Sequence, residues 1–262
     1  MKKLFIKNRQ GEKLSVIVEI AKNQKGLVFI CHGLGGFKEQ SHVQIINKAF
    51  IENNYTTIIF DAADSIGESE GDFSTATQTS YYQDLEDVVN WTSKQLWYEE
   101  PFVLVGHSAG AASVMIYLDN YTKKVKAIAP LAVAYNGQKV LERFLPPDKV
   151  AEVEKTGWHI GNYISKDPNQ PEVSLKLNWH NFKNDIVLYD ILPILPKVTI
   201  PILMIVGSED PLMIPKYQKI IYDKINSDKE LHIIQGSSHT FRESKHLEEI
   251  YHIFDKWIKN KL

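Results

Sequence analysis

The chain has 262 residues, of which 44% are hydrophobic and 24% charged, and its formal net charge is −2. This size predicts one large globular domain or a domain with a modest insertion, and the near-neutral charge gives no reason to expect nucleic acid or an anionic membrane as a partner. The single cysteine excludes an intramolecular disulfide. No apolar run approaches the roughly 20 residues of a membrane span, and the first residues lack a signal-peptide core, so we expect a cytoplasmic protein.

The hydrophobic pattern first predicts two strands, over residues 2–7 and 14–20, and then a regular succession of strands and helices. Further strands are expected at residues 27–31, 56–60, 102–105, 125–129, 202–206 and 230–234, and helices at residues 42–53, 79–95, 108–120, 215–225 and 243–260. Apolar strands that alternate with amphipathic helices are typical of a parallel sheet covered on both faces. We therefore predict an α/β fold with a mainly parallel eight-stranded sheet flanked by helices.

This succession is interrupted between residues 132 and 196, a segment rich in prolines and aromatic residues. About 65 residues is too long for a loop in a compact domain, so the segment should have structure of its own. We therefore divide the chain into a core of residues 1–131 and 197–262 and an insertion of residues 132–196.

A serine stands at the centre of the pentapeptide Gly-His-Ser-Ala-Gly, residues 106–110, between a predicted strand and a predicted helix. A G-x-S-x-G turn in this context holds its serine in a strained conformation and exposes the hydroxyl. Small residues are needed on both sides because the strand and helix backbones pass very close to each other. The pattern predicts Ser108 as a nucleophile.

A serine hydroxyl needs a base to remove its proton, and the base needs a third group to orient it. His239 follows a predicted strand in a turn of glycine and serine, and it is the candidate base. Asp210 follows the strand at residues 202–206 and is the candidate acid, with Glu209 and Asp61 as alternatives. The chain order serine, aspartate, histidine is the one expected of α/β-hydrolases.

A glycine-rich turn, His-Gly-Leu-Gly-Gly at residues 32–36, follows another predicted strand. Glycines allow a backbone to approach a substrate closely. Two backbone amides aimed at a developing oxyanion would stabilise it. We expect these amides to belong to Leu34 and to Ala109, the residue after the nucleophile.

Together these motifs resemble the α/β-hydrolase superfamily over nearly the whole chain and, more narrowly, the bacterial serine esterases that include cinnamoyl and feruloyl esterases. The resemblance rests on H-G-x-x-G at residues 32–36, G-H-S-x-G at residues 106–110, the turn from Gly207 through Asp210 to Pro215, and His239-x-Phe241. Residues 61–71 depart from the usual D-x-x-G-x-G-x-S-x-G, because Ala63-Asp64-Ser65-Ile66 stands where a glycine-bearing turn is normal. The resemblance implies that residues 132–196 form a small cap over the nucleophile.

The motifs and the resemblance predict a serine hydrolase that cleaves small-molecule carboxylic esters through an acyl-enzyme. We expect no metal and no other cofactor, because the nine histidines lack a metal-binding spacing and no dinucleotide loop is present. The protein should be a monomer or a homodimer. A thioesterase, an amidase or peptidase, an acyltransferase and a non-catalytic ligand-binding relative remain alternatives. In the insertion, Trp158, Tyr163 and Trp179 either contact the substrate or only pack the cap together.

Overall fold

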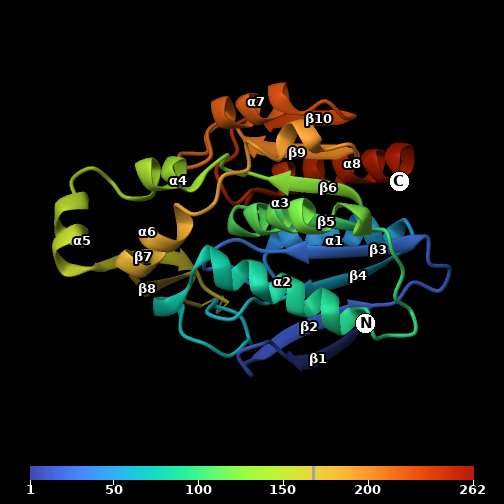
Figure 1. Cartoon of the computed structure of the whole chain (residues 1–262), viewed down its shortest axis with the longest axis horizontal. Coiled ribbons are helices and arrows are strands. Elements are labelled where there is room, and N and C mark those ends of the chain that lie inside the picture. Colours follow the sequence, from blue (N-terminus) through green and yellow to red (C-terminus); the bar gives the residue numbers. More distant parts are fainter. Residues whose placement is uncertain (167–168) are drawn as a thin grey trace.

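A computed structural model describes residues 1–166 and 169–262 and has a central eight-stranded sheet in the order β1-β2-β4-β3-β5-β6-β9-β10 (Figure 1). The strands are β1 Lys2–Lys7, β2 Lys13–Glu19, β3 Gly26–Cys31, β4 Tyr55–Phe60, β5 Phe102–His107, β6 Val125–Leu131, β9 Ile202–Gly207 and β10 Lys229–Ile234. Only β2 runs antiparallel to its neighbours β1 and β4, and every other pair in this sheet is parallel. The predicted mainly parallel sheet of eight strands is confirmed.

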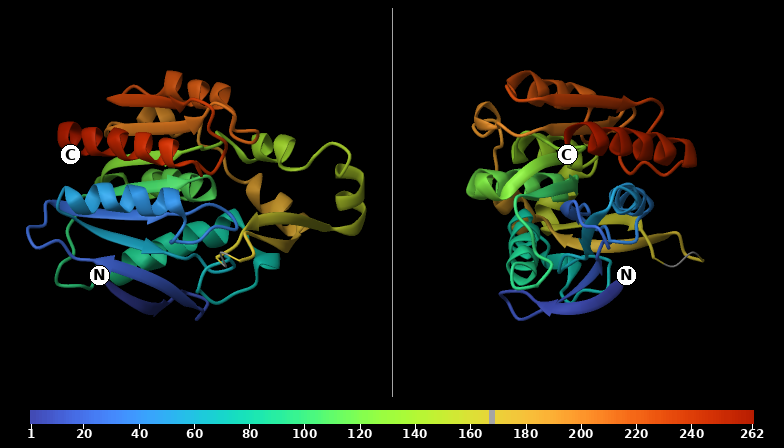
Figure 2. Two further views of the ribbon diagram at one scale, coloured as in Figure 1. Left: turned by 180° about the vertical axis from the view of Figure 1, so that it is seen from behind. Right: turned by 90° about the vertical axis from the view of Figure 1, so that its right-hand side faces the viewer.

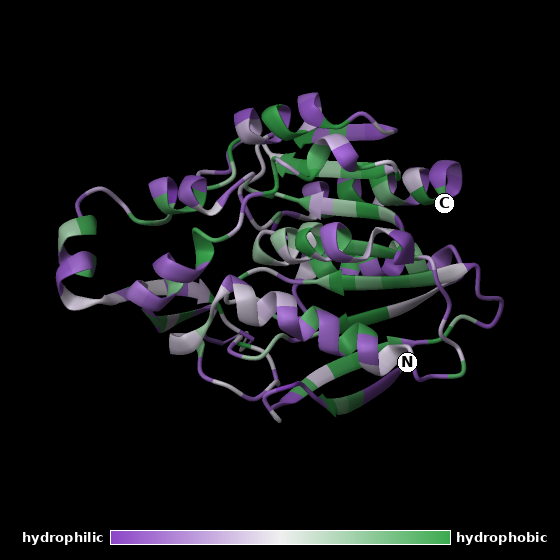
Figure 3. Ribbon diagram, in the orientation of Figure 1, coloured by the Kyte–Doolittle hydropathy of each residue, from purple (hydrophilic) through white to green (hydrophobic). Residues whose placement is uncertain are grey.

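Helices cover both faces of this sheet, as Figure 2 shows from two further directions. Helices α1 Ser41–Glu52 and α8 Ser244–Lys261 pack on one face. Helices α2 Gln78–Thr92, α3 Ala109–Tyr121 and α7 Pro215–Lys224 pack on the other. Side chains of a strand alternate between the two faces, so Val28 and Ile30 of β3 join one core while Leu27 and Phe29 join the other. This double burial explains the continuous apolar strands, which Figure 3 shows as hydrophobic segments at the centre of the molecule.

The segment between β6 and β9 has regular structure that the sequence pattern did not specify. It contains α4 Gly137–Phe144, α5 Val150–Thr156, the antiparallel hairpin β7 Trp158–Ile164 and β8 Glu172–Asn178, and α6 Trp179–Ile186. Short 3-10 turns, η1 Phe73–Thr75, η2 Thr122–Lys124 and η3 Leu195–Lys197, complete the chain. Residues 167 and 168 of the predicted insertion lie outside the described residues.

The helices and the hairpin of this segment extend from the end of the sheet at which the parallel strands finish (Figure 1). Their buried side chains form a small apolar cluster together with residues of the main body. Among the residues that the structure describes, no helix is both long and apolar enough to span a membrane.

Candidate active site

Ser108 lies in a sharp turn between the last residue of β5 and the first residue of α3, with φ 54° and ψ −115°. The glycines two residues before and two residues after it have no room for side chains. A Cβ on Gly106 would lie 2.3 Å from the carbonyl oxygen of Gly110, and a Cβ on Gly110 would lie 2.4 Å from that of His32. The Ser108 amide donates a 2.9 Å hydrogen bond to Leu131, which holds the turn against the adjacent strand. The G-x-S-x-G pattern is therefore required by backbone packing.

The structure brings Ser108, His239 and Asp210 into one hydrogen-bonded row. Nε2 of His239 lies 3.0 Å from the Ser108 hydroxyl, and Nδ1 lies 2.6 Å from Oδ2 of Asp210. The other Asp210 oxygen accepts hydrogen bonds from the amides of Leu212 and Met213, both 2.9 Å. Burial by itself would raise the pKa of Asp210, but the hydrogen bonds and the attraction of His239 outweigh it, so the pKa is lowered.

An ionised Asp210 has a direct consequence for its neighbour. Its carboxylate accepts a hydrogen bond from the Nδ1–H group of His239, which leaves Nε2 without a proton and able to accept the proton of the Ser108 hydroxyl. The arrangement can therefore transfer a proton away from Ser108 while the carboxylate stabilises the resulting imidazolium.

The two competing carboxylates lie elsewhere. Glu209 is exposed, although it is adjacent to Asp210 in the chain. Asp61 is fully buried in an ion pair with Lys38, whose Nζ lies 2.6 Å away, and it also accepts hydrogen bonds from the amides of Lys38 and Glu68. Asp61 therefore joins the loop after β3 to the loop after β4 and is fully engaged there.

The glycine-rich turn after β3 lies directly beside the nucleophile. A Cβ on Gly33 would lie 3.1 Å from that of Ser108, and Leu34 and Ala109 line the same cavity as Ser108. Ala109 is the first residue of α3, so its amide has no acceptor within the helix. Both residues predicted to supply oxyanion donors are thus next to the serine.

A buried histidine stabilises this turn. Nε2 of His32 accepts a 3.0 Å hydrogen bond from the amide of Ala62, so Nδ1 carries the proton and donates to the carbonyl of Gly33 at 2.8 Å. The same ring therefore connects the turn after β3 with the end of β4. Burial lowers the pKa of His32, which keeps the ring neutral in this role.

Two further histidines pack in a row with His239. The ring centroid of His107 lies 4.8 Å from that of His239 and 4.5 Å from that of His42. Nε2 of His107 donates a 2.8 Å hydrogen bond to the main-chain carbonyl of His239. Burial, reinforced by the neighbouring histidines, lowers the pKa of His42 to about 3 and that of His107 well below its usual value. His107 belongs to the serine motif, whereas the sequence analysis missed His42, for which the local sequence carries no signal.

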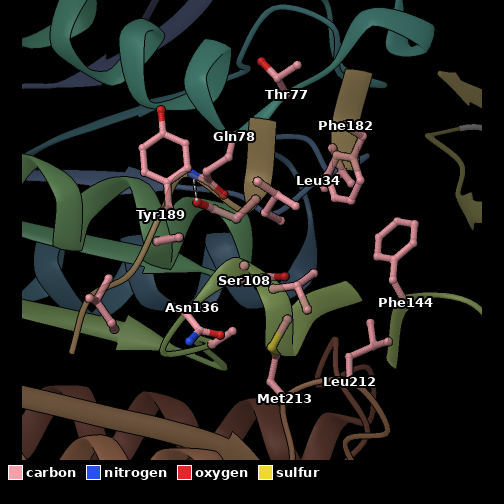
Figure 4. A pocket seen from close by; sticks show the side chains of 17 residues that line it. Leu34, Thr77, Gln78, Ser108, Asn136, Phe144, Phe182, Tyr189, Leu212 and Met213 are labelled. Carbon is pink, nitrogen blue, oxygen red and sulfur yellow. Dashed lines mark hydrogen bonds between the residues drawn. The ribbon is translucent and has the colours of Figure 1, made fainter. Parts of the chain in front are cut away.

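A cavity of about 70 Å³ opens at the Ser108 hydroxyl and is mostly apolar (Figure 4). Among the described residues, its lining contains no charged side chain. The lining residues come from α2 and the residue before it, from α3, α4 and α6, from the turn after β5, and from the loops after β3, β6, α6 and β9. They are Leu34, Thr77, Gln78, Ser108, Ala109, Ala112, Ala134, Asn136, Gly137, Val140, Phe144, Phe182, Ile186, Tyr189, Ile191, Leu212 and Met213.

The aromatic residues in this lining differ from those suggested by the sequence. Trp179 lies outside it, stacked on Phe144 with ring centroids 5.9 Å apart and packed beside Phe182. Trp158 is also outside the lining, and its ring contacts the ammonium of Lys176 at 3.9 Å. Both tryptophans therefore pack against residues of the segment between β6 and β9, whereas Phe144 and Phe182 face the cavity.

Tyr163 is likewise absent from the lining. Its ring lies against Gly35, where a Cβ would come within 2.4 Å of it, and packs edge-on with Phe73 at 4.8 Å. It thus covers the glycine-rich turn from outside. Its position explains why Gly35, which has φ 63°, tolerates no side chain.

As for metal binding, the part of the chain that the structure describes has no group of three or more His, Cys, Asp or Glu side chains that could hold an ion.

The mainly parallel sheet, the serine turn after β5 and the flanking helices define an α/β-hydrolase. The chain belongs to the family described as serine aminopeptidase, S33, whose model matches residues 22–181. It is similar, at 25% identity over 97% of both chains, to an uncharacterized 31.7 kDa protein in the traX-finO intergenic region of Escherichia coli.

Solved structures share the fold over nearly its whole length. Est1E from Butyrivibrio proteoclasticus, with ferulic acid bound, is 21% identical and has a TM-score of 0.77, with 98% of each chain covered. Alpha/beta hydrolase domain-containing protein 10 from mouse is 19% identical and has a TM-score of 0.76, with 99% of each chain covered. The predicted α/β-hydrolase fold is confirmed by these comparisons.

Proposed function

We propose that this hydrolase cleaves carboxylic esters with Ser108 as nucleophile, His239 as base and Asp210 as the acid that orients the base. The Ser108 hydroxyl attacks the ester carbonyl carbon while Nε2 of His239 accepts its proton. The carbonyl oxygen becomes an oxyanion that accepts hydrogen bonds from the amides of Leu34 and Ala109. The bond to the alcohol then breaks, and the alcohol leaves with the proton from His239.

Water completes the reaction. It gives a proton to His239 as it attacks the acyl group on Ser108, and the serine oxygen leaves with that proton while the acid is released. The observation that carries this proposal is the row of Ser108, His239 and Asp210, with distances of 3.0 and 2.6 Å, at the opening of a mostly apolar cavity.

The absence of charged side chains from the described lining favours an ester substrate over the peptide N-terminus that the aminopeptidase family description suggests. An aminopeptidase has to accommodate the ammonium group of a peptide N-terminus, and burying an unpaired cation is costly. None of the described lining residues is an aspartate or a glutamate that could pair with it. A neutral acyl group fits this lining better.

We further propose that residues 132–196 act as a cap on a core of residues 1–131 and 197–262. Phe144, Phe182 and Ile186 of this segment line the cavity beside Ser108, which supports a role in acyl selection. Est1E, the similar structure with ferulic acid bound, makes hydroxycinnamate esters a reasonable class to test. The other chemistries of this fold, cleavage of thioesters or amides and acyl transfer, use the same residues.

The test combines active-site labelling with a substrate panel. A fluorophosphonate probe should label the wild-type protein at Ser108 and leave Ser108→Ala unlabelled. Ester, thioester and amide analogues of one acyl group should then be compared by kcat/KM, and the ester should be cleaved fastest. Preference for the thioester or the amide would replace the ester assignment, and failure of the probe to label Ser108 would indicate a non-catalytic relative.

A further inference from the structure

The proposed cleavage leaves one buried polar side chain in the cavity wall without a role. Gln78, the first residue of α2, lines the cavity and is only 3% exposed. Apart from the Ser108 hydroxyl, the other side-chain oxygens of the lining are engaged elsewhere. The oxygens of Thr77 and Asn136 cap α2 and α4, and the Tyr189 hydroxyl hydrogen-bonds to Thr79. Gln78 therefore carries the acceptor to examine for substrate recognition.

The hydrogen bonds of Gln78 determine which end of its amide faces the cavity. Nε2 donates to the carbonyl of Ala109 at 3.1 Å (Figure 4) and to the hydroxyl of Ser113 at 2.9 Å. The Ser113 hydroxyl in turn donates to the same carbonyl at 3.0 Å. A reversed amide would place Oε1 against the Ala109 carbonyl, where two acceptors repel each other. The nitrogen is therefore held in the wall, and Oε1 is the group left for the cavity.

Oε1 of Gln78 is an acceptor in need of a donor. Among the described residues no group donates a hydrogen bond to this oxygen. The protein does not fully enclose the oxygen either, so a ligand in the cavity can reach it. An apolar acyl group that displaced water from Oε1 would leave this acceptor unpaired, which weakens binding. An acyl group with a hydroxyl would supply the missing donor.

The size and charge of the cavity restrict this acyl group further. A cavity of roughly 150 Å³ is known to bind benzene. The cavity beside Ser108 measures about 70 Å³ and is open on one side, so a short acyl chain fills it, whereas an aromatic ring would extend through the opening. Its described lining has no charge to pair with a charged acyl group. Both features favour a short, neutral acyl chain over the larger hydroxycinnamates.

We propose that the pocket selects short, uncharged hydroxyacyl esters and that Gln78 is the specificity-determining residue, accepting a hydrogen bond from the hydroxyl of the acyl group. This inference rests on the proposed ester cleavage and names its substrate class. Gln78 also contacts Ala109, so a loss of overall activity in a Gln78 variant would not by itself identify its role. The test must therefore compare substrates within one variant.

The experiment measures kcat/KM for the p-nitrophenyl esters of butanoate, 2-hydroxybutanoate and 3-hydroxybutanoate. For each protein, the value for a hydroxylated ester is divided by the value for butanoate. Comparing this ratio between wild type and Gln78→Met cancels the intrinsic reactivity of each ester and any general loss of activity. For at least one isomer we expect the ratio to fall about tenfold, the effect of one hydrogen bond between neutral groups. Gln78→Asn, a milder change, should shift it in the same direction.

Ser113→Ala is the matched control, because it removes one anchor of Nε2 and leaves Oε1 in place. It should retain the wild-type ratio. The inference is overturned if Gln78→Met leaves both ratios unchanged, or if Ser113→Ala lowers them as much. Cleavage of a p-nitrophenyl ferulate as fast as the butanoates would overturn the size limit. Failure of the proposed ester cleavage would look different from failure of the Gln78 inference. In that case the wild type would cleave no ester, and Ser108 would not react with the fluorophosphonate probe.

Discussion

His107 donates a 2.8 Å hydrogen bond from Nε2 to the main-chain carbonyl of His239, 132 residues further along the chain. The residue before the proposed nucleophile thus holds the backbone of the proposed base. Because the two ring centroids lie 4.8 Å apart, a charge on His107 would oppose the imidazolium that the proposed mechanism requires on His239. Burial lowers the pKa of His107 and removes that conflict.

This contact predicts a graded response to substitution at His107. His107→Gln can retain a donor near the position of Nε2, whereas His107→Leu cannot and leaves the carbonyl of His239 unpaired. We expect His107→Leu to lower kcat by about tenfold or more with little change in KM, because the base is misplaced and the substrate pocket is not. His107→Gln should restore most of kcat at equal melting temperature. Equal losses in both variants would indicate a purely structural histidine.

Ser108→Ala should abolish turnover and leave the fold intact, because only a hydroxyl is removed. The expected loss of kcat is about 10⁴- to 10⁶-fold, by analogy with other serine triads. Ester hydrolysis by purified protein and the thermal melting curve together provide the check. Activity above a few per cent in protein free of contaminating esterases would refute Ser108 as nucleophile.

Asp210→Asn should keep the geometry of the site and remove the negative charge that orients His239. A comparable change in a serine protease costs about 10⁴ in kcat. Glu209→Gln is the matched control at the adjacent, exposed position and should behave like wild type. If Glu209→Gln were the damaging change, the acid of the triad would have been misassigned.

The pH dependence of stability should reveal Asp84, which is buried and accepts hydrogen bonds from Asn8 and Ala63. Burial raises its pKa to about 7. Between the unfolded carboxyl pKa of about 3.9 and this value the folded state binds the extra proton, so rising pH favours unfolding through this group. Asp84→Asn, which cannot ionise, should therefore gain stability relative to wild type between pH 5 and pH 8, by about 1–3 kcal/mol. Urea unfolding of both proteins at pH 5 and pH 8 measures their free energies of unfolding. If the difference between variant and wild type were the same at both pH values, the prediction would be wrong.

Phe144→Ala should enlarge the cavity and shift selectivity towards longer acyl chains. We expect the ratio of kcat/KM for octanoate to that for butanoate to rise about tenfold, the usual effect of a few methylene contacts. Trp158→Ala is the control, because Trp158 belongs to the same segment but lies outside the lining. A uniform loss across acyl lengths in Phe144→Ala would mean that the segment does not select the acyl group.

Outside residues 132–196, the order of strands and helices and the positions of the serine, aspartate and histidine turns could be derived from the sequence alone. These features are local, since a buried strand, a strained turn and its glycines each leave a pattern within a few residues. The sequence could not decide between Asp210 and Glu209 with the same certainty. That choice depends on how the turn after β9 directs one carboxylate inward and exposes its neighbour.

Only the tertiary structure decided which side chains surround the nucleophile. Phe144 and Phe182 line the cavity while Trp179 packs behind them, because the fold of the segment between β6 and β9 determines which way each ring points. Gln78 and His42 reach the site from helices distant in the chain, and no short motif marks them. Local sequence encodes where the chain turns, whereas the pocket is formed by side chains whose directions depend on packing between elements.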